Sequence, residues 1–506
     1  MAVTRPQQEE GSIFERSRPG RVAYSFRHEV EGTDARVGLP AAWVRESVDG
    51  LPELWEGDVV RHFTRLSQWN YGVDTGFYPL GSCTMKYNPK INEVAVRHPA
   101  FAGLHPRVPD QQAQGAQQVM WELQEFLKAI TGLDAVTLQP AAGAQGEFTA
   151  LKVIRRCLAE RGDPRAKVLI PDTAHGTNPA SCTLNDYKVV SLKSGKDGIL
   201  TPDEVERKMD AKTAGIMITN PNTLGKFEKH IVEIARIVHE RGGFVYADGA
   251  NLNSFMGWAD VKRLGVDAIH INLHKTFSTP HGGGGPGAGP VAVVKELEPY
   301  LPTPRVVREG EHLRLDHDVP KSIGRVMAHN GNFGVLLRAW TYIRELGPDG
   351  IRQAAENAVL NANYLRTQVE GDWHIPYPGP CMHEFVASDK NLPNHVHTLN
   401  VAKRLIDLGF HPPTIYFPLI VPGALMVEPT ETEGKETLDA FAAALQSIAA
   451  EAVSDPETLL HAPHHAVRTL LDEVKAARNP VLKWGSDSAE AASDKADGPA
   501  TTPEEA

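Results

Sequence analysis

The chain has 506 residues, of which 41% are hydrophobic, 23% charged and 7% aromatic. This length allows roughly two to four domains of ordinary size, and the composition excludes a collagen-like or wholly disordered chain. The 52 Lys and Arg residues against 63 Asp and Glu residues give a net charge of -11. Such a chain lacks the basic surface on which nucleic acid or an anionic membrane would bind, so we expect neither as a partner.

Four cysteines lie far apart in the sequence, at positions 83, 157, 182 and 381. They form no CxxC pair, and their spacing is typical of neither a disulfide framework nor a zinc site, so we expect no metal. The first 21 residues are polar and lack the apolar stretch of a signal peptide. Because no apolar run approaches the roughly 18 residues of a membrane span, we predict a cytoplasmic protein.

Changes in composition divide the chain into four predicted parts. Residues 1–110 mix charged residues with Pro and Gly, which is typical of an extended arm with a few short helices. Periodic apolar residues then predict a large domain at 111–325 and a smaller C-terminal domain at 326–480. Because residues 487–506 contain no large apolar side chain, the segment 481–506 is predicted to be a disordered tail.

Short apolar runs alternate with amphipathic segments through the large domain. The runs predict strands, and apolar residues at three- and four-residue steps predict helices. In chain order these are a helix at 111–130, a strand at 135–138, a helix at 146–161, strands at 167–170, 188–192 and 216–219, a helix at 228–241, strands at 244–247, 268–272 and 291–294, and a helix at 333–345 in the smaller domain. The alternation predicts an α/β fold with a mostly parallel sheet covered on both faces.

Ligands of such a sheet bind beyond the carboxyl ends of the strands, so polar residues that follow each strand are candidates for a site. Lys275 follows the strand at 268–272, Asp248 ends the strand at 244–247, and residues 143–146 join a strand to a helix. A pyridoxal phosphate enzyme needs a lysine amine for the cofactor aldehyde, a carboxylate for the pyridine nitrogen and free amides for the phosphate. The sequence therefore predicts a pyridoxal phosphate site.

Each of these features also has an ordinary structural interpretation. Taken alone, Lys275 is a solvated surface charge, Asp248 a turn or helix cap, and residues 143–146 a small-residue turn. His175 follows another strand and could lie on the pyridine ring, although most loop histidines have no such function. The glycine-rich loop at 282–287 allows close backbone approach to a ligand but lacks the spacing of a Walker loop. Only the combination favours the cofactor site.

Four longer motifs resemble the C-terminal half of the glycine cleavage P-protein. They lie at residues 78–89 (YPLGSCTMKYNP), 174–181 (AHGTNPAS), 273–277 (LHKTF) and 426–432 (MVEPTET). The resemblance extends from about residue 64 to about residue 470. It implies a fold-type I pyridoxal phosphate enzyme with a large domain and a smaller C-terminal α+β domain. Because the chain is about half the length of a single-chain P-protein, the resemblance also implies the two-subunit form.

The resemblance implies functions for individual residues. Lys275 and His175 would act in catalysis, with Lys275 holding the cofactor, His175 stacking on its ring and Asp248 binding its nitrogen. The other implied cofactor-binding residues are Ala144, Gln145, Thr223, Ala250 and His274. The implied reaction is decarboxylation of glycine, with release of carbon dioxide and transfer of the aminomethyl group to the lipoyl arm of H-protein. The implied partner is glycine dehydrogenase subunit 1, with two copies of each subunit in a heterotetramer.

Two other interpretations stay open. An aminotransferase or a cysteine desulfurase would share the fold, although none of the four cysteines is convincingly placed for a desulfurase. A non-catalytic scaffold subunit is the second, although a scaffold needs neither the lysine nor the carboxylate. The sequence does not identify the groups that hold the glycine carboxylate, for which Asn222, His383 and Glu384 are candidates. Cys83 is interpreted as either a redox-sensitive or a structural thiol.

Overall fold

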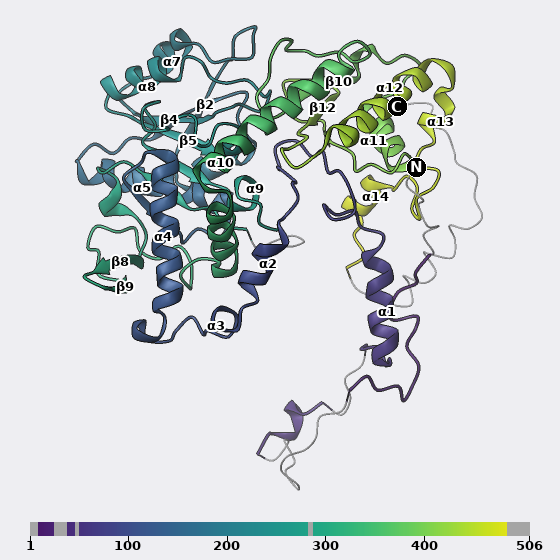
Figure 1. The fold of residues 1–506 in the computed structure, drawn as a ribbon, viewed down its shortest axis with the longest axis horizontal. Coiled ribbons are helices and arrows are strands. Elements are labelled where there is room, and N and C mark those ends of the chain that lie inside the picture. Colours follow the sequence, from purple (N-terminus) through teal and green to yellow (C-terminus); the bar gives the residue numbers. More distant parts are fainter. Residues whose placement is uncertain (1–8, 25–37, 46–49, 282–286, 483–506) are drawn as a thin grey trace. The chain divides into compact units, whose positions relative to one another are not determined.

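The computed structural model describes residues 9–24, 38–45, 50–281 and 287–482 (Figure 1). Two predictions lie outside these residues, namely the disordered tail from residue 483 onward and most of the glycine-rich loop. The chain forms two compact units, one of residues 1–71 with 462–506 and the other of residues 72–461. In the described part of the chain, every helix is too short or too polar to cross a membrane. The predicted division at residues 110, 325 and 480 stays a prediction.

The smaller unit is built around one helix of the N-terminal segment. Its described elements are η1 (Ala41–Trp43), α1 (Glu56–Ser67) and α14 (Glu473–Arg478). Glu10, whose side chain is buried, accepts a hydrogen bond from His62 of α1 at 2.9 Å and pairs with Arg16 at 2.6 Å. The predicted extended arm at residues 1–110 stays a prediction.

The larger unit contains all the remaining elements. Its helices are α2 (Lys90–Val96), α3 (Pro99–Ala102), η2 (Asp110–Gln112), α4 (Gln114–Thr131), α5 (Gly143–Glu160), α6 (Thr177–Leu184), α7 (Pro202–Lys208), α8 (Ile231–Glu240), η3 (Leu252–Ser254), α9 (Leu273–Thr276), η4 (Glu298–Tyr300), α10 (Phe333–Val369), η5 (Asp389–Asn391), α11 (Thr398–Asp407), α12 (Lys435–Ser454) and α13 (Pro456–Leu460). Its strands are β1 (Ala135–Thr137), β2 (Lys167–Pro171), β3 (Lys188–Leu192), β4 (Thr213–Thr219), β5 (Phe244–Gly249), β6 (Ala268–Ile271), β7 (Val291–Val293), β8 (Arg305–Glu309), β9 (His312–Asp316), β10 (Phe385–Ser388), β11 (Thr414–Ile415) and β12 (Ala424–Val427).

A seven-stranded sheet forms the centre of the large domain, with the strand order β1-β7-β6-β5-β4-β2-β3. Strand β7 runs antiparallel to both of its neighbours, and the other pairs are parallel. The predicted mostly parallel sheet is therefore confirmed. Because β4, β5 and β6 are adjacent and parallel, the loops that follow them lie at one edge of the sheet, where the predicted site residues are found.

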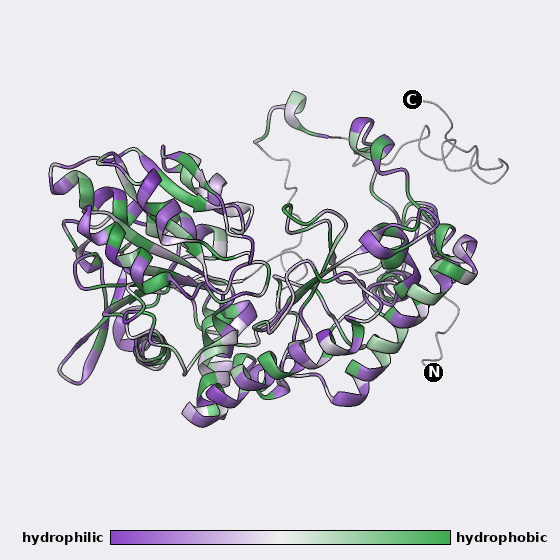
Figure 2. Ribbon diagram, turned by 90° about the horizontal axis from the view of Figure 1, so that it is seen from above, coloured by the Kyte–Doolittle hydropathy of each residue, from purple (hydrophilic) through white to green (hydrophobic). Residues whose placement is uncertain are grey.

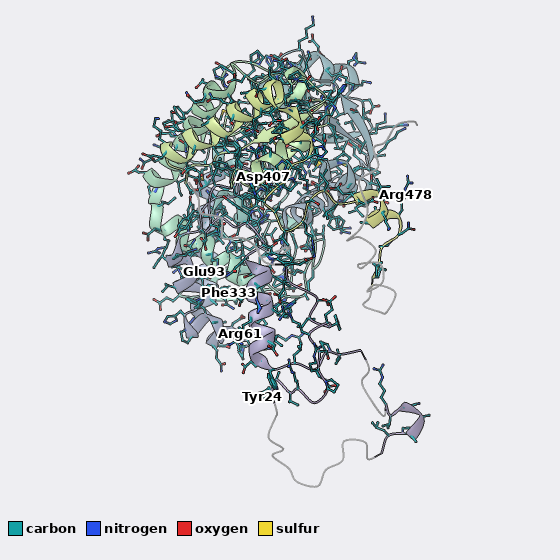
Figure 3. All side chains as sticks on the ribbon, turned by 90° about the vertical axis from the view of Figure 1, so that its right-hand side faces the viewer. Tyr24, Arg61, Glu93, Phe333, Asp407 and Arg478 are labelled. Atoms are coloured by element: carbon teal, nitrogen blue, oxygen red, sulfur yellow. The ribbon has the colours of Figure 1, made fainter. Side chains whose placement is uncertain are left out.

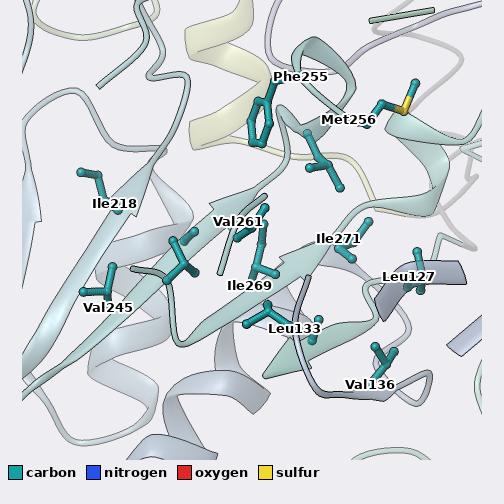
Figure 4. Close-up of a cluster of buried hydrophobic side chains, with 14 of the residues drawn as sticks. Leu127, Leu133, Val136, Ile218, Val245, Phe255, Met256, Val261, Ile269 and Ile271 are labelled. Carbon is teal, nitrogen blue, oxygen red and sulfur yellow. The ribbon is translucent and has the colours of Figure 1, made fainter. Parts of the chain in front are cut away.

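Helices cover both faces of this sheet. Alternate residues of each strand point to opposite faces, so apolar side chains on both faces need to be covered. In β4, for example, Ile216 and Ile218 pack on the face covered by α4, α7, α8 and the first half of α10. Figure 4 shows Ile218 in this cluster, together with Ile269 of β6 and Leu127 of α4. Met217 packs on the other face, under α5 and α6. Each helix contains both hydrophobic and hydrophilic residues along its length, as expected for helices with one buried side (Figure 2).

A second, three-stranded sheet lies in the C-terminal part, with the order β10-β12-β11 and antiparallel pairing throughout. Its apolar core includes residues of α11, α12, α13 and the second half of α10. This arrangement confirms the predicted smaller α+β domain. The strand β12 also pairs with the segment before the first sheet, because Leu80 bridges Val427 and the Gly81 amide donates to Met426 O at 3.2 Å.

Helix α10 joins the cores of the two sheets. It was predicted only over residues 333–345, whereas it extends to Val369 after a break at Gly347, whose φ of 62° and ψ of -176° are not helical. Proline usually ends a helix, so Pro348 indicates an end near this position. In the structure Pro348 instead lies in the first turn of the helical segment that follows the break. Near its start, α10 packs on α2, where Arg338 forms two hydrogen bonds with Glu93 at 2.7 and 3.0 Å (Figure 3 labels Glu93 and Phe333).

Candidate active site

Lys275 lies at the carboxyl edge of the large sheet. Strand β6 is buried throughout and leads directly into α9, a single turn that contains the lysine. The side chain is 8% exposed, and its Nζ donates to the carbonyl oxygen of Ser82 at 2.8 Å. A buried amine whose hydrogen bond goes to a neutral carbonyl is suited to react with an aldehyde.

Asp248 lies at the end of β5, next to His270 of β6 in the sheet register, and is 2% exposed. Its carboxylate accepts hydrogen bonds from Asn178 Nδ2 at 3.0 Å and from the Ala250 amide at 2.9 Å, and its Oδ1 lies 3.5 Å from His270 Nε2. Burial alone would raise the pKa of Asp248. The nearby imidazoles of His270 and His175, with the two hydrogen bonds, outweigh burial and lower that pKa below its usual value.

His175 follows β2, as predicted, and is held by a chain of hydrogen bonds. Its Nδ1 lies 2.8 Å from the Thr177 hydroxyl, which donates to the buried Glu147 at 2.6 Å. Burial lowers the pKa of His175, although the charge of Asp248 opposes this effect. The ring is therefore neutral at pH 7 and fixed in orientation, as a ring that stacks on a cofactor requires.

The start of α5 approaches the same edge of the sheet. The first amide that bonds within the helix is that of Gly146, which donates to Ala142 O, so the preceding amides point away from the helix. A Cβ at Gly143 would lie 2.4 Å from Asn272 Oδ1, so only glycine allows the helix to start this close to β6. Ala144 is exposed there. The Gln145 side chain instead bonds the backbone of Ala141 and Val326, both at 2.6 Å.

Thr223 links the loops that follow β2 and β4. It is 0% exposed, and its hydroxyl donates to the carbonyl oxygen of Thr173 at 2.7 Å. The neighbouring Asn222 uses its amide within its own loop, where Nδ2 donates to Gly198 O at 2.8 Å and to Glu228 at 2.7 Å. Asn222 thus shapes the loop, which makes it a poor candidate for holding a substrate carboxylate.

His274 precedes the lysine and contacts a second histidine. Its ring lies edge-on to that of His281, with 5.0 Å between centroids, and its Nδ1 accepts a hydrogen bond from the Ala288 amide at 3.3 Å. Burial, with a smaller effect of Lys275, lowers the pKa of His274 to about 3 and that of His281 to about 4. Both rings are therefore neutral at physiological pH.

A group of acidic side chains from the smaller domain also lies at the lysine. Glu384, Glu428 and His383 are each 0% exposed. Glu384 accepts from the Ser82 amide at 2.7 Å, and Glu428 accepts from the Thr84 hydroxyl at 2.6 Å. No function was predicted for Glu428, and the only signal for it was its place in the motif at residues 426–432.

The segment that carries Ser82 and Thr84 connects this acidic group to Lys275. Both residues adopt left-handed backbone conformations, with φ of 63° and 45°, which non-glycine residues rarely adopt. Strain of this kind persists only where surrounding contacts fix the backbone, and it concentrates at functional sites. A little further on, Lys86 Nζ donates to Thr276 O at 2.8 Å, directly beside the lysine.

Cys83 lies within the same segment and is partly buried. Burial raises the pKa of its thiol, the charge of Lys275 opposes that effect, and the two glutamates Glu384 and Glu428 add to it. A raised pKa disfavours the reactive thiolate. This observation favours the structural over the redox-sensitive interpretation of Cys83.

Comparison with known proteins identifies the family. The chain is 53% identical over 480 residues to a probable glycine dehydrogenase (decarboxylating) subunit 2 of Halalkalibacterium halodurans, covering 94% of this chain and 98% of that protein. The protein of the same description from Caldanaerobacter subterraneus is 53% identical over 475 residues, covering 93% and 98%. The chain belongs to the glycine dehydrogenase (decarboxylating) subunit 2 family.

Two family models match parts of this family member. The model described as glycine dehydrogenase, C-terminal domain, matches residues 354–465, and that of class-V aminotransferases matches residues 144–296. The second match contains Lys275, Asp248 and His175, whereas the first contains Glu384 and Glu428.

Solved structures share the fold of this subunit 2 family member. A crystal structure of glycine decarboxylase (P-protein) of the glycine cleavage system, in inhibitor-bound form, aligns with a TM-score of 0.69 and 21% identity, covering 82% of this chain and 94% of that one. Sphingosine-1-phosphate lyase of Burkholderia pseudomallei aligns with a TM-score of 0.61 and 16% identity, covering 82% and 94%. These likenesses confirm the predicted fold-type I architecture.

The residues of this chain fit pyridoxal phosphate. A buried lysine amine, a buried carboxylate whose pKa is lowered, and a helix start of small residues meet at one edge of the sheet, as the cofactor requires. The buried Asn178 Oδ1 and Thr276 Oγ1 have no hydrogen-bond partner among the described residues. Buried polar atoms are usually satisfied, so these two are free to bind a ligand.

Proposed function

We propose that this chain catalyses the pyridoxal phosphate-dependent decarboxylation of glycine and transfers the aminomethyl group to the lipoyl arm of H-protein, as a glycine dehydrogenase (aminomethyl-transferring). The observation that carries the proposal is the relation, over more than nine tenths of the chain, to proteins named glycine dehydrogenase (decarboxylating) subunit 2. The buried lysine and carboxylate at the strand ends support it. Carbon dioxide is the second product.

In this reaction pyridoxal phosphate supplies an electron sink for the electron pair released when a carboxylate leaves. Lys275 holds the cofactor through its amine. Asp248, kept anionic by its partners, holds a proton on the ring nitrogen. The neutral ring of His175 packs on the cofactor ring, and the amides of Ala144 and Gln145 bind its phosphate.

Three further residues complete the proposed cofactor site. Ala250 contributes through its amide, which fixes the Asp248 carboxylate. Thr223 fixes the loop after β4 through its bond to Thr173. His274, partly buried and neutral, lies next to the lysine and limits access of water to it.

The proposed assembly contains a second, related chain. The designation subunit 2 of the relatives supports a partner of the subunit 1 type. We infer a heterotetramer with two copies of each subunit, which receives lipoyl-carrying H-protein and glycine in the cytoplasm. Light scattering of the copurified subunits measures this stoichiometry, and a one-to-one heterodimer would contradict it.

The cofactor proposal predicts a visible absorbance band in the full-length protein supplied with pyridoxal phosphate. Lys275→Ala should abolish the lysine-bound band, because no other amine replaces Lys275 at the strand end. A matched control is Lys226→Met, which removes a different, partly buried lysine whose amine binds the backbone carbonyls of Pro378 and Pro380. This control should keep the band.

The reaction proposal predicts exchange of carboxyl-labelled glycine with bicarbonate, measured with H-protein and the related subunit present. Exchange should require all the components and should be lost in Lys275→Ala. A band without exchange would refute glycine decarboxylation while keeping the cofactor. Absence of the band in folded, partnered protein would instead favour a scaffold subunit.

A further inference from the structure

Two glutamates and a histidine of the smaller domain form a closed acidic group at Lys275 that the functions proposed above leave unused. One oxygen of Glu384, one of Glu428 and one ring nitrogen of His383 lie within 4.8 Å of one another, and all three side chains are fully buried. Ser82 ties this group to the lysine, because its amide donates to Glu384 at 2.7 Å and its carbonyl accepts from Lys275 at 2.8 Å.

The environment of the two carboxyl groups allows only one of them to be charged. Two carboxylates taken out of water at this separation repel each other, so the pair retains a proton at a pH where exposed glutamates have lost theirs. The titratable groups that face the pair are Lys275, His383 and Cys83. Burial raises the pKa of both glutamates, and the charge of Lys275 opposes this effect. Burial lowers the pKa of His383 to about 3, so the histidine is neutral.

Hydrogen bonding distinguishes the two acids. Glu428 accepts bonds from the Thr84 amide at 3.1 Å, from the Thr84 hydroxyl at 2.6 Å and from Asn253 Nδ2 at 3.2 Å, all of which stabilise its anionic form. Glu384 accepts only from the Ser82 amide, and its Oε1 has no partner among the described residues. The proton therefore resides mainly on Glu384, at Oε1, which lies 3.8 Å from His383 Nε2.

The proposed reaction consumes one proton per turnover. The bond between the glycine carboxylate and its methylene carbon breaks, and the electron pair of that bond forms the new carbon–sulfur bond. The disulfide bond breaks, its electron pair stays on the second sulfur, and carbon dioxide leaves. Glycine is thereby oxidised and the disulfide reduced, and the released sulfur takes up one proton to become a thiol.

Building on the proposed function, we propose that Glu384 and Glu428 share one proton beside Lys275 and that this proton is the one delivered to the sulfur released from the lipoyl disulfide. The pair is then reprotonated before the next turnover. The segment with the left-handed residues Ser82 and Thr84 fixes both acids relative to the lysine.

A divalent metal is the competing occupant of this group, because the spacing of the three side chains also suits metal ligands. Two observations argue against a metal. The Glu428 oxygens already accept hydrogen bonds and are therefore not available as ligands, and the charge of Lys275 would repel a cation. Elemental analysis of the purified protein should find no stoichiometric metal, and a stoichiometric metal that is lost from the Glu428→Gln variant would overturn the proposal.

Infrared spectroscopy of the full-length protein without cofactor tests the shared proton independently of activity. The difference spectrum between wild type and Glu384→Gln should contain the carbonyl band of one protonated carboxyl group at pH 6 to 7, and the band should vanish at higher pH. Glu228→Gln is the matched control, because Glu228 is also fully buried and burial raises its pKa to about 7, but it bonds Leu200 and Asn222 instead of facing Lys275. It should lose a carboxyl band of its own and leave that of Glu384 unchanged.

Kinetics with H-protein and the related subunit test the use of the proton. A donor must be protonated to act, so the rate of aminomethyl transfer in the wild type should fall as the pH rises through the pKa of Glu384, which burial and the neighbouring Glu428 raise well above that of an exposed glutamate. In Glu384→Gln the rate should drop about 100-fold, and this alkaline decline should disappear. Glu384→Asp should restore part of the rate and the pH dependence, and Glu228→Gln should keep the wild-type pH dependence.

The outcomes separate this proposal from the proposed function. Wild-type activity with an unchanged rate and pH dependence in Glu384→Gln would overturn the proton delivery while leaving glycine decarboxylation intact. Absence of the Glu384 carboxyl band at pH 6 in folded wild type would overturn the shared proton. If the wild type has the infrared carboxyl band and binds cofactor but does not exchange the carboxyl group of glycine, the proposed function is refuted, and proton delivery to the lipoyl sulfur is refuted with it.

Discussion

Asp248 keeps a negative charge at a position where burial alone would neutralise it. The charge is stabilised by its neighbours, since His270 lies 3.5 Å away and itself contacts the Tyr246 hydroxyl, while Asn178 bonds the other carboxylate oxygen. A carboxylate fixed in this way is already oriented and needs no rearrangement to hold a proton on a ring nitrogen. The function of Asp248 thus depends on residues of β6 and α6 as much as on its own strand.

Asp248→Asn should therefore reduce glycine decarboxylation by about 100-fold, because an amide cannot hold the pyridine nitrogen protonated. The lysine-bound absorbance band should remain, since Lys275 is unchanged. Initial rates of glycine carboxyl exchange measure the effect.

The matched control is Asp267→Asn, at the opposite edge of the same sheet. Asp267 precedes β6, accepts a hydrogen bond from the Val245 amide at 2.7 Å and pairs with His239. It should change stability but leave the exchange rate as in wild type. Equal losses in both variants would contradict the function given to Asp248.

At the level of single residues, sequence could predict only what local pattern encodes. Lys275, Asp248 and His175 were found because each follows a strand, and that signal is local. The side chain of Gln145 bonds backbone groups of its own loop and of residue 326, contacts that no local pattern reveals, so only its backbone amide is left for the predicted cofactor contact. Glu428 acquires its place only because β12 pairs with the segment after Leu80.

At the level of elements, the strands of the large sheet were predicted more accurately than the ends of helices, whereas strands β8 to β12 were not predicted. The strand β3 was predicted with its observed bounds, and the predicted helix at 111–130 matches α4, because a short β-branched apolar run and an amphipathic helix each have a strong local signal. The second half of α10 was missed. Its break depends on Gly347, and whether a helix resumes after such a break is decided by packing, here by Ala362, Leu365 and Val369 in the core of the small sheet.

Gly347→Ala should destabilise the protein by about 1 to 3 kcal/mol, because φ near 62° with ψ near -176° is accessible almost only to glycine. No heavy atom lies within 4 Å of a Cβ at this position, so the cost comes from the backbone and not from a clash. Urea denaturation of the full-length protein measures the change.

Gly371→Ala provides the comparison for that variant. A Cβ at Gly371 also meets nothing within 4 Å, but the backbone there is not left-handed, so this variant should be as stable as wild type or slightly more stable. Equal effects of the two substitutions would show that strain at the break in α10 is absent.

At the level of the whole molecule, every proposed site residue lies in the larger unit. Residues 82–86, 175, 248, 275, 384 and 428 all fall within 72–461. Helix α10 contributes side chains to the apolar core of the large sheet, and the site contains Glu384 and Glu428, which lie next to strands of the small sheet. The predicted large domain at 111–325 would thus lack both.

A fragment of residues 72–461 should therefore fold and bind pyridoxal phosphate with the same visible band as the full-length chain. A fragment of residues 111–325 should not, because it lacks α10 and the segment that bonds Lys275. Circular dichroism and cofactor absorbance measure both. A cofactor band in the shorter fragment would refute the requirement for the segment and the acids.

The contacts around Lys275 also determine when the site can form as the chain folds. Lys275 bonds Ser82, 193 positions earlier in the chain, and Thr84 bonds Glu428, 344 positions later. Contacts between such distant parts of a chain carry a large loop-closure cost and form slowly. During synthesis the segment after Leu80 leaves the ribosome long before its acidic partners exist, so the site closes only after nearly the whole larger unit has been made. The appearance of the lysine-bound absorbance band is therefore a measure of completed folding of this chain.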